Sequence, residues 1–414
     1  MTVSRRTFIA GVAAVPLAAG LDARSLFGAT SKPHVVVAGA GAFGGWTALQ
    51  LLERGAHVTM VDEWGPGNSL SSSGGKTRVI RAIYGPDRIY SEMVKRAYPM
   101  WEKLAATSHE PLYVEMGALW MQRGDDSYVR AAIPILEKLG FPVDKLTIDE
   151  AAKKYPQIDF KGVKSVYLER KAGALYARHA CVVVRDAFDK AGGTYHTATA
   201  KPGPIRNGSM THVSLADGKK LEADAYVFAC GPWLGRLFPD VIGERVLPTR
   251  QEVYYFATPK GPVSWDAKHL PIWIDFGPHI VYGIPDVEGK WLKVADDTRG
   301  VPVDPTTQDR HPRKDLIEGA RHFLSERFPK IANEPLLDAE VCQYENSPDG
   351  NLIIDRHPGA KNVWLLGGGS GHGFKLAPAV GELASEAMLR GKAIPETFRL
   401  ERLKGGKRKT QFDK

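Results

Sequence analysis

Cysteine is scarce in this chain, with three among 414 residues. Three cysteines cannot build a disulfide framework. Cys181 and Cys230 lie in apolar runs and are expected to be buried, unreactive thiols. Cys342 lies far from both, in a stretch of mixed polarity just before a turn-rich loop. Its role is open at this point.

Other features are missing as well. The chain has no Cys/His spacing typical of zinc sites and no basic stripe interleaved with aromatic residues. It also lacks internal repeats, and outside the N-terminal segment no apolar run approaches the roughly 20 residues that span a bilayer. We therefore expect no metal site, no nucleic-acid partner and no integral membrane span.

The composition is that of an ordinary globular protein, with 43% hydrophobic and 25% charged residues. A chain of 414 residues exceeds the usual size of a single core, which favours two domains or one large composite body. Part of the formal net charge of +8 lies at the two ends. Residues 401–414 form a basic tail, which we interpret as a solvated extension.

Residues 1–30 have the pattern of an export signal. Ser4, Arg5, Arg6 and Phe8 resemble a twin-arginine motif, and a mild apolar run follows them. That run is too short to span a bilayer comfortably, and such signals are addresses read by a receptor. We expect recognition by the twin-arginine export machinery and a periplasmic location. An incidental basic, apolar N-terminus is the alternative.

The first ordered stretch predicts a βαβ unit that contains a glycine motif. An apolar strand at 35–38 is followed by a tight turn, a helix at 46–54 and a second strand at 57–62. The turn reads G-x-G-x-x-G, a pattern in which glycines permit close approach of a pyrophosphate to a helix N-terminus and an acid after the second strand binds a ribose hydroxyl. This predicts dinucleotide binding without choosing between FAD and NAD. The predicted binding residues are Gly39, Gly41, Ala42, Phe43, Gly44 and Asp62.

A second glycine loop lies near the C-terminus, in "LLGGGSGHGFKLAPAVGE". It again follows a strand and precedes a helix, predicted at 377–389. A plain nicotinamide enzyme is not expected to repeat this arrangement, whereas a second helix N-terminus suits the far end of an extended flavin. A simple turn is the alternative. The residues concerned are Gly369, Gly371, His372, Gly373 and Lys375.

Between these two glycine loops the sequence pattern changes. Helices are predicted at 90–106 and 130–139, and short aromatic and β-branched runs at 246–297 predict an antiparallel sheet. We expect an α/β (α+β overall) fold, in which a Rossmann-like FAD-binding domain receives an inserted antiparallel-sheet substrate domain. The predicted limits are 33–112, 173–245 and 349–400 for the first domain, and 113–172 and 246–348 for the second.

Several motifs resemble one family in order and over nearly the whole chain after the signal. They are the N-terminal glycine motif, "KTRVIRAIYG", "ADAYVFACGPW", "WLKVADD", "VCQYENSPDGNLIIDRHP" and "SGHGFKLAPAVGE". The chain is similar in these to the monomeric sarcosine oxidase and N-methyltryptophan oxidase group of the D-amino-acid-oxidase-like flavoproteins. The resemblance implies FAD as cofactor and adds Thr77 and Arg78 to the residues that bind it.

The resemblance also implies roles for single residues. Cys342 matches a cysteine that is bonded through sulfur to the flavin ring, and a free buried thiol is the alternative. Arg81 and Lys375 match the pair that holds the substrate carboxylate, as two cations suit a small anion. Lys293 matches a lysine that promotes oxygen reduction, although the polar face of a sheet would also accommodate a lysine. Tyr344 matches an aromatic residue of the substrate cavity, although packing against a neighbouring strand would also explain it.

Three departures from the family pattern stand out. Asp297 replaces a histidine of the substrate cavity, Gly74 replaces a histidine beside the flavin, and Lys76 replaces an acid. A carboxylate at position 297 would pair with a cationic or hydroxyl-bearing substrate group, which puts sarcosine itself in doubt. Gly74 is expected to open space or to remove a hydrogen bond to the ring.

Together these features predict an FAD enzyme that oxidises the C–N bond of an amino acid, with a secondary or N-methylated amine. Hydride passes to flavin, the imine hydrolyses, and O2 is expected to reoxidise the flavin to give H2O2. A monomer is expected from the resemblance. The alternatives are a dehydrogenase that passes electrons to a quinone or carrier, a non-catalytic flavin- or ligand-binding protein and, last, a nicotinamide dehydrogenase.

Overall fold

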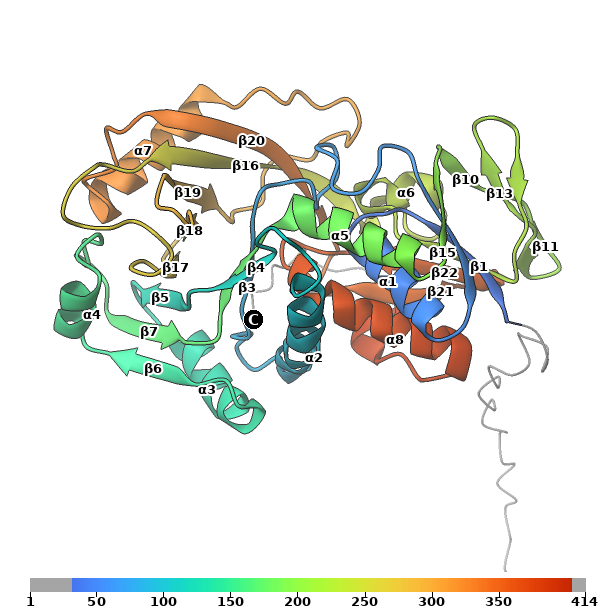
Figure 1. Cartoon of the computed structure of the whole chain (residues 1–414), viewed down its shortest axis with the longest axis horizontal. Helices are drawn as coiled ribbons and strands as arrows, with labels where there is room; N and C mark the ends of the chain where they lie inside the picture. Colours follow the sequence, from blue (N-terminus) through green and yellow to red (C-terminus); the bar gives the residue numbers. More distant parts are fainter. Residues whose placement is uncertain (1–31, 404–414) are drawn as a thin grey trace, which may run out of the picture.

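The structure is a computed structural model that describes residues 32–403. The predicted export signal, and the tail beyond residue 403, lie outside the described residues. Two large sheets dominate the molecule and lie side by side in Figure 1, one around β1 and the other around β16 and β20. No helix in the described part of the chain is long and apolar enough to cross a membrane.

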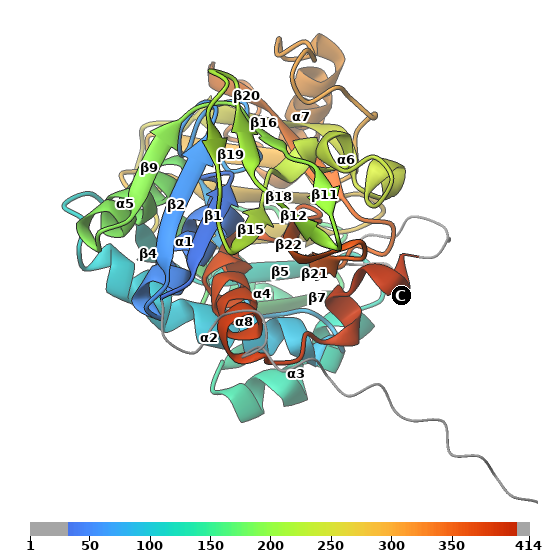
Figure 2. The same ribbon diagram turned by 90° about the vertical axis from the view of Figure 1, so that its right-hand side faces the viewer.

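The first sheet has six strands in the order β21-β22-β15-β1-β2-β9. All neighbours are parallel except β21 and β22, so most connections are crossovers that place helices on the sheet. Figure 2 shows β9, β2, β1 and β15 next to one another. The strands are β1 (His34–Ala38), β2 (His57–Asp62), β9 (Thr194–Thr197), β15 (Ala225–Phe228), β21 (Ile353–His357) and β22 (Ala360–Gly367).

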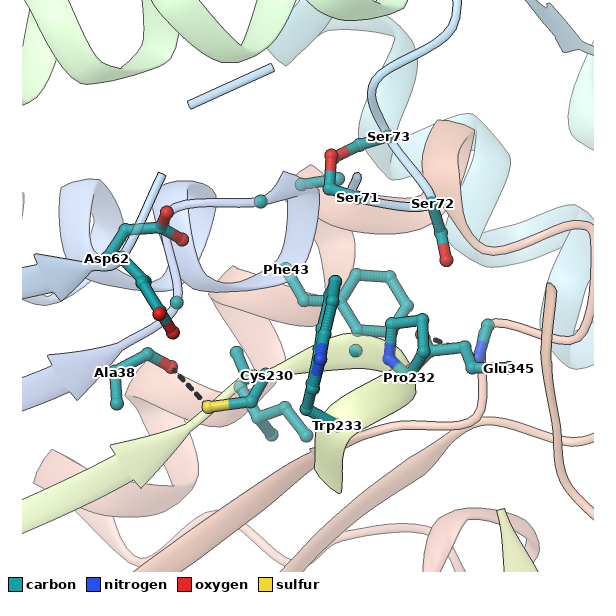
Figure 3. A pocket seen from close by; sticks show the side chains of 18 of the residues that line it. Ala38, Phe43, Asp62, Ser71, Ser72, Ser73, Cys230, Pro232, Trp233 and Glu345 are labelled. Atoms are coloured by element: carbon teal, nitrogen blue, oxygen red, sulfur yellow. Dashed lines mark hydrogen bonds between the residues drawn. The ribbon is translucent and has the colours of Figure 1, made fainter. Parts of the chain in front are cut away.

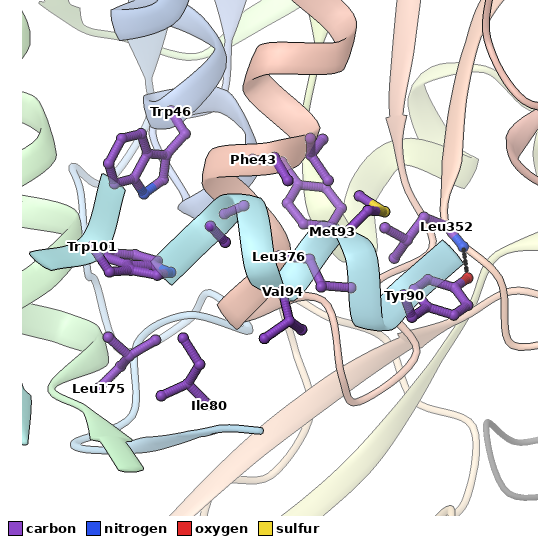
Figure 4. Packing of buried hydrophobic residues seen from close by; sticks show 14 of the residues in the cluster. Phe43, Trp46, Ile80, Tyr90, Met93, Val94, Trp101, Leu175, Leu352 and Leu376 are labelled. Carbon is purple, nitrogen blue, oxygen red and sulfur yellow. Dashed lines mark hydrogen bonds between the residues drawn. The ribbon is translucent and has the colours of Figure 1, made fainter. Parts of the chain in front are cut away.

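One face of this sheet is covered by helices that form the main core. Helix α1 packs against α8 and α5, and α2 packs against α8. Figure 4 shows Tyr90, Met93 and Trp101 of α2 beside Phe43 and Trp46 of α1. Burying each large apolar side chain contributes about 1.5–3 kcal/mol. The helices are α1 (Ala42–Glu53), α2 (Arg88–Ala105), α5 (Ala177–Lys190) and α8 (Ala377–Arg390).

The opposite face is covered by short elements whose side chains meet alternate residues of β1. Val36 and Ala38 point to this side, where they join Met210, Val213 and Phe228 in a separate cluster. The covering elements are β10 (Ala200–Pro202), β11 (Ile205–Arg206), β12 (Ser209–Met210), β13 (Val213–Leu215), β14 (Lys220–Leu221), η2 (Gly231–Trp233), α6 (Leu234–Leu237) and η3 (Gly243–Arg245).

The second sheet has eight strands in the order β20-β16-β19-β18-β17-β5-β7-β6. It is antiparallel except where β17 runs parallel to β5. The strands are β5 (Ala118–Gln122), β6 (Val143–Leu146), β7 (Ser165–Glu169), β16 (Leu247–Ala257), β17 (Ile272–Phe276), β18 (Ile280–Pro285), β19 (Trp291–Asp296) and β20 (Leu336–Asn346). The helices of this part are α3 (Ser127–Leu139), α4 (Ile148–Lys154) and α7 (Lys314–Arg327).

A small third sheet is formed where the chain passes between the two large ones. Its order is β3-β8-β4, with β3 (Arg78–Ile80), β8 (Gly173–Leu175) and β4 (Tyr113–Glu115). Near the C-terminus η4 (Phe374–Leu376) leads into α8, and η5 (Glu396–Phe398) and η6 (Leu400–Arg402) follow it. The indole Nε1 of Trp101 donates a hydrogen bond to the Lys375 carbonyl at 2.9 Å, which attaches η4 to α2.

The predicted fold class, a mixed α/β protein with an antiparallel sheet, is confirmed, while the exact domain limits stay a prediction. Several helix boundaries differ from the prediction, and α1 differs most. Helix α1 begins at Ala42 and not at Trp46, so the second half of the glycine motif is already helical. Glycine lowers helix propensity, which hid this first turn, but close packing on the sheet outweighs that cost.

A buried ion network holds α7 against the second sheet. Asp275 of β17 and Arg327 at the end of α7 are each 1% exposed, and Arg327 Nε lies 2.7 Å from Asp275 Oδ2. Arg123 reaches the other oxygen of the same carboxylate at 2.6 Å. The carboxylate therefore has cationic partners on both of its oxygens.

We expect Asp275→Asn to lower the free energy of unfolding by about 3–5 kcal/mol, because Arg327 is left as a buried charge without its anion. Urea unfolding followed by circular dichroism measures this. The control is Asp144→Asn, which removes the exposed pair with Arg170 and should cost less than about 1 kcal/mol. Equal losses in the two variants would contradict the assignment.

Candidate active site

A cavity of about 330 Å³ lies against the first glycine motif (Figure 3). Both glycine loops contribute to its wall, as do the segment before β3 and the turn after β15. Ser72 and Glu345 are among the lining residues, and their Oγ and Oε2 atoms are buried with no hydrogen-bond partner among the described residues. Such unsatisfied groups are typical of a surface made for a polar ligand.

Steric constraints explain the glycines of the first motif. Gly39 has φ +105°, and a Cβ there would lie 2.4 Å from the Ala229 carbonyl oxygen. A Cβ at Gly44 would lie 1.8 Å from the Gly39 carbonyl oxygen. Gly41, Ala42 and Phe43 line the cavity, and no side chain caps the first amides of α1. The arrangement therefore presents free N–H groups to an anion such as a pyrophosphate.

Asp62 lies at the end of β2 and lines the same cavity. Its Oδ2 accepts a hydrogen bond from the Ala40 amide at 2.8 Å, and Oδ1 accepts from the amides of Trp64 and Gly65 at 2.9 and 2.8 Å. Burial raises the pKa of Asp62, and these amide hydrogen bonds oppose that rise. The carboxylate fastens the glycine turn as well as facing the cavity.

The second glycine loop divides its residues between two cavities. Gly369, Gly371 and Gly373 line the large one as predicted for cofactor contact, whereas His372 and Lys375 line a smaller cavity instead. His372 Nε2 lies 2.9 Å from the Gly350 carbonyl, and Nδ1 lies 3.2 Å from the Tyr84 hydroxyl. Both ring nitrogens of His372 are therefore engaged within the protein, and its role as a cofactor ligand stays a prediction.

The smaller cavity has a volume of about 50 Å³ and shares Gly371 with the large one. Arg81 and Lys375 both line it, and both are buried. The Arg81 guanidinium lies 4.7 Å from the Tyr84 ring and 5.1 Å from the Trp120 ring. Lys375 Nζ donates to the His372 carbonyl at 2.9 Å. Burial, together with the Arg81 charge, holds the pKa of Lys375 well below its usual range.

Asp297 also lines the smaller cavity and adds an acidic group to the two cations, Arg81 and Lys375. Its Oδ1 accepts a hydrogen bond from the Tyr344 hydroxyl at 2.8 Å. Burial raises the pKa of Asp297, while the Tyr344 hydrogen bond and the charges of Arg299 and Arg81 lower it. Tyr344 itself lines the large cavity, so the Asp297–Tyr344 pair connects the two spaces.

Glu169 is a nearby acid that sequence reasoning missed. It ends β7 and is fully buried, and its carboxylate accepts hydrogen bonds from the amides of Ala82 and Ile83, just after Arg81. Burial raises the pKa of Glu169 to about 7, against the effects of these hydrogen bonds and Arg81. No motif marks this position, since the strand pairing that brings it there joins distant segments.

Four other predicted residues form a cluster beside the cavities. Lys293 Nζ donates to the Thr77 carbonyl at 2.9 Å, and Arg78 Nη2 lies 3.3 Å from Cys342 Sγ. Arg78 lines the large cavity, whereas Lys293, Thr77 and Cys342 line neither. Thr77 Oγ1 is buried and has no partner within residues 32–403.

Two of the departures and two cysteines have plain structural outcomes. At Gly74 the expectation of opened space is wrong, because a Cβ there would lie 1.9 Å from the Asn68 carbonyl oxygen. Lys76 forms a partly exposed ion pair with Asp338 at 2.5 Å. Burial raises the pKa of Cys181 to about 11 and raises that of Cys230, which supports unreactive thiols, although Cys230 also lines the large cavity.

Comparison with known proteins decides what this pair of cavities belongs to. The FAD dependent oxidoreductase family, DAO, matches residues 34–387. The chain belongs to this family. It is 29% identical to the monomeric sarcosine oxidase of Bacillus sp. (strain B-0618), over 86% of this chain and 92% of that protein. It is 26% identical to the N-methyl-L-tryptophan oxidase of Yersinia pestis (strain Pestoides F), over 85% and 93%.

The fold agrees with this membership. The structure of L-proline dehydrogenase from P. horikoshii superposes with a TM-score of 0.79 and 22% identity, covering 92% of this chain and all of that one. The predicted family resemblance is thereby confirmed, and the protein is an FAD-dependent oxidoreductase. The glycine cradle, the uncapped α1 terminus and the unsatisfied polar atoms on the wall fit FAD, whose site would be the large cavity.

A stability measurement tests the buried state of Lys293. Burial and the Arg78 charge lower the pKa of Lys293 from 10.5 to about 7. Between pH 7 and pH 10.5 the Lys293 amine binds more protons in the unfolded chain than in the folded chain, so the free energy of unfolding rises with pH. The buried amine therefore destabilises the fold most at pH 7 and below. We expect Lys293→Met to be more stable than wild type by roughly 2–5 kcal/mol at pH 7. Urea unfolding at pH 7 and pH 9.5 should show a smaller difference in stability between the variant and wild type at the higher pH. A difference that does not change with pH would contradict a lowered pKa of Lys293.

Proposed function

We propose that the protein oxidises the C–N bond of an amino acid whose amine is secondary or N-methylated. FAD, when bound, takes a hydride from the carbon beside the nitrogen and passes the electrons to O2, which gives H2O2, while the product imine hydrolyses in water. The observation that supports this most is the small cavity with two buried cations, which shares Gly371 with the dinucleotide cavity.

Arg81 and Lys375 suit the carboxylate of an amino acid. A guanidinium presents a planar fork of N–H donors and an ammonium adds a point charge, so together they hold a small anion in one orientation. Their mutual repulsion is part of what lowers the pKa of Lys375, and a bound carboxylate would relieve it. This gives the cavity a preference for anionic substrates that its small volume restricts further.

Asp297 sets a second requirement on the substrate. A carboxylate in the same cavity favours a group that donates hydrogen bonds or carries positive charge, and the Tyr344 hydroxyl already supplies one such donor. The amine of the substrate, or a hydroxyl or cation on its side chain, would be the second. We infer that amino acids with such a group are preferred over sarcosine.

The same proposal includes oxygen as the electron acceptor and a covalent flavin. Lys293 is buried against the Thr77 carbonyl, at the position that the resemblance assigns to oxygen reduction. The Arg78 guanidinium, which lines the large cavity, donates a hydrogen bond to Cys342 Sγ at 3.3 Å. Cys342 would hold the flavin through a carbon–sulfur bond in place of one S–H and one flavin C–H bond, and O2 would take up the two electrons and two protons as H2O2.

The location and assembly are also proposals. Ser4, Arg5, Arg6 and Phe8 support export by the twin-arginine machinery to the periplasm, where a tethered flavin would not be lost. A monomer acting on small molecules accords with the resemblance. Western blots of fractionated cells with wild type and Arg5→Lys/Arg6→Lys chains would distinguish export from retention.

The first experiment mixes purified protein with N-methylated amino acids in the absence of oxygen and follows the loss of flavin absorbance. We expect reduction, with sarcosine poorer than substrates that carry a hydroxyl or cation. Lys375→Met should raise KM by about 10- to 100-fold, since a charge-assisted hydrogen bond is lost. Lys171→Met, which removes a surface cation paired with Glu102, is the control.

Admitting oxygen then tests the acceptor. H2O2 equal to the amine consumed, with slower reoxidation in Lys293→Met and unchanged reduction, would support the oxidase. Turnover only with a quinone would favour the dehydrogenase. If none of the amines reduced the flavin, a non-catalytic flavin-binding protein would be favoured.

The covalent link is tested by acid precipitation. We expect flavin absorbance to stay with the washed pellet of wild type and to appear in the supernatant of Cys342→Ala, because only a covalent bond survives unfolding. Cys181→Ala, which removes another buried thiol, should behave as wild type. Flavin in the wild-type supernatant would make Cys342 a packed thiol.

A further inference from the structure

Glu345 is a buried carboxylate for which the proposed chemistry has no use. It lies near the end of β20, is 8% exposed and lines the large cavity (Figure 3). Its Oε1 accepts a hydrogen bond from the Gly369 amide at 3.1 Å. Its Oε2 is buried and has no hydrogen-bond partner among the described residues.

The surroundings of this carboxylate are built from glycine. A Cβ at Gly369 would lie 2.9 Å from Oε1, and Cβ atoms at Gly231 and Gly367 would lie 3.7 and 3.6 Å from Oε2. Burial raises the pKa of Glu345 to about 7, and among the described residues no cation opposes this. A buried carboxyl oxygen without a partner costs free energy, so a ligand that supplies a donor would recover it.

The chemistry of the wall narrows the ligand group. A carboxylate repels a phosphate, and the free amides of α1 already serve the pyrophosphate at the Gly41 end. Glu345 directly follows Tyr344, which also lines the cavity and bonds Asp297 of the substrate space. Its place is therefore towards the part of the cofactor between the phosphates and the ring, where hydroxyl groups are the donors.

We propose that Glu345 binds the cofactor by accepting a hydrogen bond, at Oε2, from a hydroxyl of the sugar-alcohol chain that joins the flavin ring to the phosphates. This hydrogen bond would make Glu345 contribute to the binding of FAD but not to the binding of its adenosine diphosphate half alone. The inference rests on FAD as the family cofactor and is independent of which amine is oxidised.

The test measures cofactor binding and does not depend on turnover. All chains carry Cys342→Ala, so that flavin exchanges freely whether or not wild type is tethered. Apoprotein of Glu345→Ala, Glu345→Gln and the unchanged parent is titrated with FAD by fluorescence quenching and with ADP by calorimetry. ADP shares the phosphates and adenosine but lacks the sugar-alcohol chain. Asp338→Asn, on the exposed part of the same strand, is the control.

We expect Glu345→Ala to weaken FAD binding by about 10- to 100-fold with ADP affinity unchanged, because a hydrogen bond to a charged group is lost. Glu345→Gln keeps an acceptor and should lose less. Unchanged FAD affinity in Glu345→Ala would overturn the proposal. So would a gain in FAD affinity, which would mean that the carboxylate repels phosphate, or an equal loss for FAD and ADP, which would place its effect on the shared half or on the fold.

Discussion

Lys293 donates a hydrogen bond from a fully buried amino group to the Thr77 carbonyl, and so joins the eight-stranded sheet to the segment that leads into β3. Neither sheet completes the site alone. The six-stranded sheet contributes the glycine loops, and the other contributes Asp297, Tyr344 and Cys342. Polar groups that would be solvated on a separate sheet are here withdrawn from water, and burial shifts their pKa values in the direction of the neutral form.

The charge balance at this junction explains its chemistry. Arg81 and Lys375 face a small space with Asp297, and Glu169 lies behind Arg81. Such a set of buried charges contributes little to stability, because desolvation offsets most of the attraction between them. It is better suited to a ligand that supplies both a carboxylate and a donor. An amino acid, the proposed substrate, has both groups, and a molecule bound there would lie next to the dinucleotide cavity, because the two cavities share Gly371.

The cofactor side depends on backbone approach more than on charge. Gly39 and Gly44 let α1 begin against the sheet with its amides free, and Gly369 makes room for the Glu345 carboxylate, because a Cβ there would lie 2.9 Å from Oε1. Trp101 holds the second loop from behind through the Lys375 carbonyl. The cavity wall is thus closely packed where phosphates are expected and polar where hydroxyls are expected, as binding of an extended dinucleotide requires.

Local patterns were enough to predict the βαβ unit with its glycine motif, the antiparallel run at 246–297, the fold class and the family. These depend on short-range periodicity and on glycines whose spacing has a steric cause. The positions of His372 and Gly74, and the importance of Glu169 and Glu345, were out of reach. A carboxylate on a strand reads the same whether it faces water or a cavity, and strand pairing between distant segments settles which. The sequence alone therefore predicted dinucleotide binding, whereas the packing of the two sheets against each other decided which side chains line the cavities.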